Sequence, residues 1–282
     1  MTVVALVSGK SGAVTVSALA LALAAPARSV LAELDPSGGT VRPGFQQGYG
    51  STAAIGLHRL ATAERSGTLG QVFDQHLVPL HGGDMSRRLL PGLTDPSQAS
   101  AMAGVWEQLV RAWPVLESDG ADVVVDAGRA VVDSGELSAV RSPAAVLRRA
   151  DVVLLVVRQT LTHVVASAPV AALMARDLQQ HGTGADALGL LLVGEEKAPP
   201  ASEISQHLRL PVLAHFDWDP ATARALAHGP RSGRELSSRS TLLRQARSSW
   251  DQIGALANWR RVQLAPAAAP FGSVYQGGGF GG

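Results

Sequence analysis

Apolar and polar residues alternate along the chain in two ways. Short apolar runs bounded by Gly, Pro or Asp predict buried strands at residues 3–7, 29–34, 122–126, 151–157, 187–193 and 211–216. Longer segments with apolar residues three or four positions apart predict helices at 15–25, 98–116, 143–150, 161–180, 201–208, 220–227 and 240–259. Because strands and helices alternate, the pattern predicts an α/β fold with a doubly wound, mostly parallel central sheet and helices on both faces.

Two regions have a weaker pattern. Residues 40–83 are rich in Gly, with short helices expected at 55–64 and 69–77, and Leu89-Leu90 is interpreted as the start of a loop through Pro91-Gly92. From 265 to 282 the chain is rich in Ala, Pro and then Gly, which is typical of a flexible tail. We therefore expect one domain over residues 1–264, followed by this tail.

The composition is that of a globular protein and excludes cysteine chemistry. Of the 282 residues, 46% are hydrophobic and 17% charged, so the chain can bury a core. It contains no Cys, which excludes disulfides, thiolate zinc sites, iron–sulfur clusters and thiol nucleophiles. The eight His follow no metal-binding pattern, and we expect no metal site built on them.

Positive charge is concentrated in the last quarter. The net charge is +1, but the chain from Arg224 onward has a balance of +6 and the first 223 residues one of −5. A basic region on an acidic body predicts an anionic partner over Arg224–Arg261, and an amphipathic helix there is suited to an anionic membrane surface. The helix expected at 240–259 also carries an apolar stripe. A helix that packs back on the sheet, with a solvated basic surface, explains the same pattern.

The uncharged segment 13–27 bears on location. It is shorter than the roughly 20 apolar residues needed to span a membrane. A signal peptide is the alternative, but the apolar run 3–7 precedes Lys10, so the usual charged start is missing. A strand, a glycine turn and a helix describe the segment better, and we expect a cytoplasmic protein.

That turn carries the main candidate chemistry. A glycine-bearing connection between a strand and a helix directs backbone N–H groups toward a ligand and favours phosphate. The standard phosphate-binding pattern G-x-x-x-x-G-K-[ST] is not met in either possible frame. The candidate nucleotide-binding residues are Gly9, Lys10, Ser11, Gly12, Ala13, Val14, Thr15, Val16 and Ser17.

The same turn resembles a degenerate deviant Walker A loop, K-G-G-x-G-K-[ST]-[ST], of the ParA/MinD superfamily of P-loop ATPases. Lys10 matches the signature lysine, which in that family reaches the nucleotide of a partner subunit in an ATP-sandwich dimer, and Gly12 and Ser17 also match. In this alignment Val14 replaces a glycine, Thr15 the phosphate-binding lysine and Val16 the hydroxyl expected on Mg²⁺.

The resemblance extends to about residue 250. Glu33-Leu-Asp35-Pro is similar to the D-x-D-P segment, which makes Asp35 a candidate catalytic residue near the γ-phosphate, Mg²⁺ or attacking water. The strand ending in Asp126-Ala-Gly is similar to Walker B followed by switch II, with Asp126 linked to Mg²⁺. Where the family often has an adenine-binding Asn, this chain has Gly194-Glu195. The implied cofactors are ATP and Mg²⁺.

The departures fall on the residues that perform hydrolysis. Losing one electrostatic contact to a transferring phosphoryl group typically costs about 10²–10³ in rate, and the alignment lacks two. We therefore expect a pseudo-ATPase or slow ATPase. The resemblance implies a homodimer and, through basic surface residues, non-specific contact with DNA. The resemblance implies that it positions a partner such as a pilus or secretion, division or segregation apparatus, at the periphery of the membrane or nucleoid. The alternatives are an active ATPase of the same family and an adaptor that binds no nucleotide and acts through its basic C-terminal helix.

Overall fold

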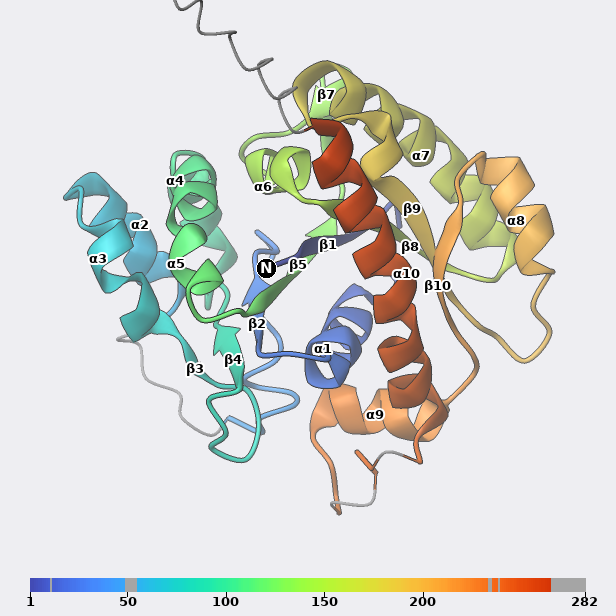
Figure 1. The fold of residues 1–282 in the computed structure, drawn as a ribbon, viewed down its shortest axis with the longest axis horizontal. Coiled ribbons are helices and arrows are strands. Elements are labelled where there is room, and N and C mark those ends of the chain that lie inside the picture. Colours follow the sequence, from blue (N-terminus) through green and yellow to red (C-terminus); the bar gives the residue numbers. More distant parts are fainter. Residues whose placement is uncertain (11, 49–54, 233–234, 238, 265–282) are drawn as a thin grey trace, which may run out of the picture.

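The computed structural model describes residues 1–10, 12–48, 55–232, 235–237 and 239–264 (Figure 1). The strands are β1 Val3–Ser8, β2 Ser29–Glu33, β3 Val78–Pro79, β4 Arg87–Leu90, β5 Asp122–Arg129, β6 Val132–Asp133, β7 Glu136–Leu137, β8 Val152–Arg158, β9 Leu188–Val193 and β10 Val212–Phe216. The α-helices are α1 Val14–Ala24, α2 Leu57–Arg65, α3 Leu69–Val72, α4 Val105–Ala112, α5 Pro114–Glu117, α6 Ala144–Arg149, α7 Leu161–His181, α8 Ala201–Leu208, α9 Pro220–His228 and α10 Thr241–Leu264. Short 3₁₀ helices cover Phe73–His76, Pro96–Met102 and Ala185–Ala187. The tail expected at 265–282 and the candidate Ser11 lie outside the described residues.

The central sheet has eight strands in the order β10-β9-β8-β1-β5-β2-β4-β3. All neighbours are parallel except β3, which runs antiparallel to β4 at the edge. The first strand lies inside the sheet, between β8 and β5. These observations confirm the predicted doubly wound, mostly parallel α/β fold.

Side chains alternate along each strand, so each face of the sheet presents apolar residues. Helices cover both of these faces. Val4 and Leu6 of β1 pack on the side of α1, α9 and α10. Val3, Ala5 and Val7 pack on the side of α2, α4, α6, α7 and α8. On the first side α1 and α10 lie next to each other (Figure 1).

The helix predicted over 98–116 is wrong as a single element. The structure divides this region into the 3₁₀ helix Pro96–Met102, α4 and α5. Glycine disfavours a continuous helix at Gly104, and Pro114 has no N–H to donate to the preceding turn. Trp106 and Leu109 of α4 still face the core, so the predicted apolar side is confirmed.

The loop predicted from Leu89 is also wrong, because residues 87–90 form β4. Arg87 and Arg88 interrupt the apolar run, so the sequence did not predict a strand. Arg88 is nevertheless buried, because it pairs with Asp74 at 3.0 Å and with Asp119 at 3.1 Å. The hairpin of β6 and β7 was not predicted either, since its strands are only two residues long.

The carboxyl ends of β1, β2, β5 and β8 meet at one edge of the sheet, as parallel strands require. Ligands of open α/β sheets bind at this edge. It therefore brings together the turn after β1, Asp35 after β2 and Asp126 within β5.

Candidate functional site: the turn after the first strand

The turn joins Ser8 to Val14, the first residue of α1. Ala13 has a left-handed backbone with φ of 48°, and its carbonyl accepts the Ser17 N–H at 2.9 Å. Among the described residues no side chain caps α1, so the first N–H groups of the helix are available to a ligand. A cavity of about 710 Å³ opens at this point. The described residues that line it are Ser8, Gly12–Val16, 35–37, Ala99, Gly128, Arg129, Val131 and Arg141.

The best-defined contact of the site joins α1 to β5. The Thr15 hydroxyl donates to Asp126 Oδ2 at 2.5 Å. Gly128 N–H donates to Asp126 Oδ1 at 3.0 Å and fixes the other carboxylate oxygen. In P-loop ATPases a loop hydroxyl and the Walker B carboxylate together hold Mg²⁺. The hydroxyl beside Asp126 is thus that of Thr15, whereas the sequence alignment assigned the hydroxyl position to Val16.

Asp126 has an unusual protonation equilibrium. Its side chain is only 2% exposed, and Glu33 is its direct neighbour in the register of β2 and β5. Burial, reinforced by the negative charges of Glu33 and Asp35, raises the pKa of Asp126 to about 7 against the hydrogen bonds from Thr15 and Gly128. A cation at this position would relieve the crowding of three carboxyl groups.

Glu33 is a site residue that the sequence analysis did not single out. It is buried, and its carboxylate accepts N–H groups of Thr40, Val41 and Gly92 at 2.7, 2.8 and 3.2 Å. Burial raises its pKa, although these hydrogen bonds act in the opposite direction. Glu33 thus ties two loops to the end of β2. In the sequence, a role for Glu33 was indicated only by its position as the first residue of the D-x-D-P-like segment.

Asp35 lies at the same edge but makes its own local turn. Its carboxylate accepts the Ser37 N–H at 2.8 Å and the Ser37 hydroxyl. It also lies directly over Gly128, since a Cβ added there would fall 2.2 Å from Asp35 Cγ. Gly128 has a φ of +63°, so glycine is required for two reasons. Asp35 therefore borders the cavity next to the Walker B-like segment.

Three other candidates do not line the cavity. Lys10 is exposed, Gly9 packs against Val170 of α7, and Ser17 is buried within α1. Gly12, which does line the cavity, also approaches Arg158 and His163. Burial and the nearby charges of Arg158 and Lys10 lower the pKa of His163.

The segment after β9 is also accounted for by local contacts. Arg158 Nε donates to Glu195 Oε1 at 2.7 Å, and Gly194 N–H donates to the Phe216 carbonyl at 2.6 Å. In this structure Glu195 is therefore an ion-pair partner of Arg158 at the end of β8.

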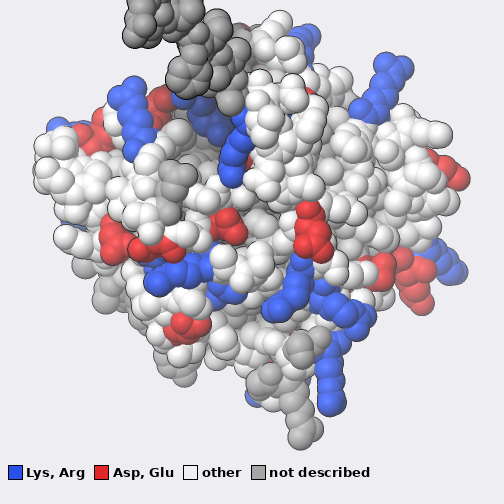
Figure 2. Space-filling model, viewed as in Figure 1, with Lys and Arg blue, Asp and Glu red and all other residues white. Residues whose placement is uncertain are grey.

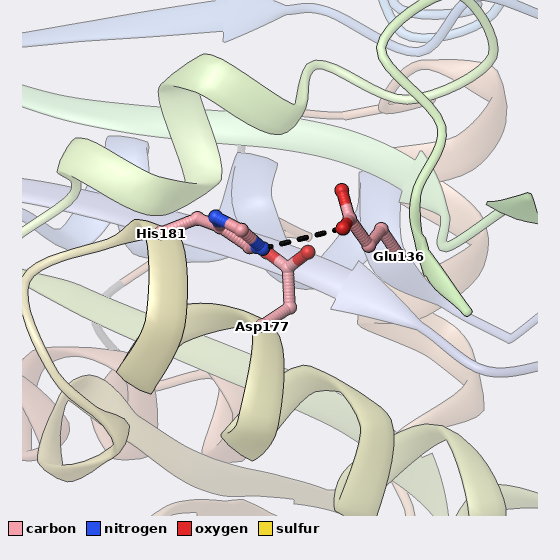
Figure 3. A group of neighbouring side chains, drawn as sticks. All are labelled: Glu136, Asp177 and His181. Carbon is pink, nitrogen blue, oxygen red and sulfur yellow. Dashed lines mark ion pairs between the residues drawn. The ribbon is translucent and has the colours of Figure 1, made fainter. Parts of the chain in front are cut away.

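A second polar cluster lies away from the cavity. Glu136, Asp177 and His181 point toward one another, with His181 Nε2 3.4 Å from Glu136 (Figure 3). Both Asp177 oxygens already accept from Arg148, at 2.9 and 2.7 Å, and the Leu137 N–H donates to one of them at 3.2 Å. Burial alone would raise the pKa of Asp177, but these partners lower it overall. The guanidinium thus takes the place of a metal, and the cluster fastens the β6–β7 hairpin to α7.

The apolar stripe of the basic C-terminal region belongs to the core. Leu242, Ala246, Trp250, Ile253 and Ala257 of α10 are buried, and Trp250 Nε1 donates to the Leu21 carbonyl of α1 at 3.0 Å. This stripe is therefore not free to enter a membrane. None of the described helices has the length and hydropathy to cross one.

Basic side chains remain on the outer surface. A groove of about 630 Å³ is lined by Arg231, Arg244 and Arg247 together with His81 and Leu243. Figure 2 shows Lys and Arg gathered over the region where α9 meets the start of α10. Three arginines of the basic C-terminal region thus line one groove. Arg260, in contrast, is buried and donates to Asp186, Thr183 and Asp151.

Comparisons with known proteins identify the fold. No protein-family model and no curated protein sequence matches the chain. Among solved structures, MinD from Pyrococcus horikoshii, complexed with Mg-ADP, has a TM-score of 0.62 at 17% identity and covers 92% of this chain and 98% of its own. A single-residue variant of McdA from Cyanothece, in complex with ATP, gives 0.63 at 13% identity, covering 90% and 96%. Cobyrinic acid a,c-diamide synthase from Mycobacterium smegmatis, with ADP and magnesium, gives 0.58 at 20%, covering 96% and 99%.

These proteins have different functions but share one fold, so the similarity shows the fold of this chain and not its function. It agrees with the resemblance in the sequence, which extends from the turn after β1 to about residue 250. The chain has the fold of the ParA/MinD superfamily of ATPases.

Proposed function

We propose that this chain is a ParA/MinD-like positioning protein that binds ATP and Mg²⁺ in the cavity after β1 and hydrolyses ATP slowly or not at all. The observation that carries the proposal is the 2.5 Å contact between the Thr15 hydroxyl and Asp126. It reproduces the pairing of loop hydroxyl and Walker B carboxylate in a cavity at the ligand-binding edge of the sheet.

The donor set fits the two cofactors. Hydroxyl and carboxylate oxygens are suitable Mg²⁺ ligands, and the free N–H groups of α1 favour phosphate. The crowding of Asp126, Glu33 and Asp35 is a further reason to expect a cation here. Bound Mg²⁺ would neutralise phosphate charge, while Thr15 and Asp126 would hold its position.

Slow turnover follows from the loop register. If Thr15 is the Mg²⁺-binding hydroxyl, the alignment shifts by one residue, and Val14 takes the lysine position of G-K-[ST]. Ala13, in its left-handed conformation, then takes the glycine position. No lysine is among the described residues that line the cavity. Because catalysis of phosphoryl transfer rests on positioning and charge, loss of the lysine should cost about 10²–10³ in rate.

An ATP titration with Mg²⁺, followed by a turnover assay, separates the alternatives. We expect binding with little or no phosphate release, and loss of Mg²⁺-dependent binding in Asp126→Ala. The exposed carboxylate Asp251 of α10 provides the control, Asp251→Ala, which should bind as the wild type does. Rapid hydrolysis abolished by Asp126→Ala would favour the active ATPase, and no binding would leave only the adaptor.

Dimer formation is the next step of the proposal. Lys10 is exposed and is therefore available to a second chain. In an ATP-sandwich dimer it would reach the partner's nucleotide, so Lys10→Ala should reduce ATP-dependent dimerisation in sedimentation velocity. An unchanged dimer would count against the sandwich arrangement. Lys197→Ala, at the other lysine of the chain, is the matched control.

The basic groove favours an anionic partner, either DNA or an anionic membrane surface, and we infer that the protein acts at the periphery of one of these. Replacing Arg244 and Arg247 by Gln should abolish co-sedimentation with that partner, which should also weaken with salt. If neither DNA nor anionic vesicles sediment the wild type, the partner is a protein of the apparatus that it positions.

A further inference from the structure

The cavity after β1 contains two cationic side chains that the loop motif does not provide. Of the described residues that line it, only Arg129 and Arg141 are positively charged. Both come from the segment that follows Asp126. The inference that follows rests on the proposed nucleotide site and concerns how that site neutralises phosphate charge.

Arg129 is fixed at its backbone and free at its side chain. It is the last residue of β5 and is paired with Ser8, the last residue before the turn. The next residue, Ala130, donates its N–H to the Ser8 carbonyl at 2.9 Å. The side chain is exposed, and it makes no hydrogen bond or ion pair with the described part of the chain. A guanidinium is therefore held beside the phosphate-binding turn without a partner there.

Arg141 is available for the same reason. It follows the β6–β7 hairpin, and its backbone N–H donates to Ser138 Oγ at 3.3 Å. Its side chain is 60% exposed, and its one ion pair within the described residues is to Asp133, at 3.8 Å and 66% exposed. An exposed pair at this distance is worth little. A phosphate group would compete successfully with Asp133.

A nucleoside triphosphate brings several negative charges next to Asp35 and Asp126. The lysine position of the turn is uncharged in either alignment, whether it falls on Val14 or Thr15. Guanidinium groups bind phosphate oxygens through two parallel hydrogen bonds and are always charged. We propose that Arg129 and Arg141 bind the terminal phosphates of the nucleotide from the segment that follows Asp126, in place of the missing lysine.

The test uses the full chain with Arg129→Gln, Arg141→Gln and the double variant. Arg111→Gln, at an exposed arginine of α4 that lines a separate cavity, is the matched control. In ATP titrations with Mg²⁺ we expect each Gln variant to bind about tenfold more weakly or worse, the double variant more weakly still, and the control unchanged. Inorganic tripolyphosphate carries the phosphate chain without the nucleoside, so its binding depends only on the groups that contact phosphate. It should therefore displace ATP from the wild type much better than from the double variant. Thermal melting should confirm that all variants fold.

Wild-type affinity in both single Gln variants and in the double variant would overturn the inference while leaving nucleotide binding intact. If the wild type itself binds no ATP, the proposed function fails and this inference fails with it. Arg129→Lys keeps the charge without the forked geometry and should bind between the wild type and Arg129→Gln. Equal loss in the Lys and Gln variants would show that Arg129 acts on the fold of β5 and not on phosphate.

Discussion

Replacing Asp126 by Asn tests the electrostatics of the site through stability alone, without any ligand. In the unfolded chain this carboxyl has a pKa of 3.8, whereas burial raises it to about 7 in the folded protein. The unfolded state therefore loses its proton at lower pH than the folded state. The contribution of Asp126 to stability is fully present below about pH 4, declines as the pH rises toward 7, and remains lost above it.

The size of the effect follows from the two pKa values. Each unit of difference corresponds to about 1.36 kcal/mol. Between pH 5 and pH 8 the wild type should lose about 3 kcal/mol of unfolding free energy through this group. The Asn side chain cannot ionise, but it can still accept the Gly128 N–H and donate to the Thr15 hydroxyl. The variant should therefore gain about 3 kcal/mol relative to the wild type over this interval.

Urea denaturation at pH 5, 6, 7 and 8 measures this difference directly. The exposed Asp133→Asn variant should show a gap to the wild type that does not change with pH. If the gap for Asp126→Asn is also constant to within about 0.5 kcal/mol, the carboxyl ionises normally and the crowded acidic site is refuted.

Further predictions concern the metal and the framework of the site. Mg²⁺-dependent ATP affinity should rise about fivefold from pH 6 to pH 7, because the proton on Asp126 must leave before the metal binds; a flat profile in isothermal titration would contradict this. Arg148→Ala should destabilise the fold by about 3 kcal/mol, since it strands the buried Asp177 carboxylate; denaturation of the double variant with Asp177→Asn should show most of the loss recovered. Glu33→Ala should cost about 3 kcal/mol by leaving three backbone N–H groups without an acceptor, and Glu33→Gln clearly less, as measured by urea denaturation. Trp106→Ala should lower unfolding free energy by roughly 3–5 kcal/mol, because a fully buried indole is replaced by a cavity; a loss below about 1 kcal/mol would refute its place in the core.

The fold could be predicted from the sequence because the parallel strands are continuous apolar runs. A run such as 151–157 is apolar at successive positions because both faces of the strand are buried, and this pattern predicts a strand of a parallel sheet. The prediction failed where burial is achieved by charge pairing, as for Arg88 in β4, or where an element is too short to show a period, as for β6 and β7.

The candidate site could be predicted in part. The turn after β1, Asp35 and Asp126 were brought to one edge, because parallel strands bring their carboxyl ends together. The sequence could not fix how the turn aligns with the phosphate-binding pattern, because a shift of the alignment by one residue leaves the same residues in the turn. The contact that decides the alignment joins Thr15 to Asp126, which lies 111 positions further along the chain. Arg129 and Arg141 were also missed, because nothing near them in the sequence resembles a phosphate-binding motif.

Calorimetric titration of ATP with Mg²⁺ into the wild type and Thr15→Val tests the central claim most directly. The two side chains have nearly the same shape, so the comparison isolates the hydroxyl that touches Asp126. We expect one nucleotide per chain in the wild type and at least about tenfold weaker binding in the variant. No ATP binding to the wild type, or equal affinity in both proteins, would contradict the assignment of this turn as a nucleotide site.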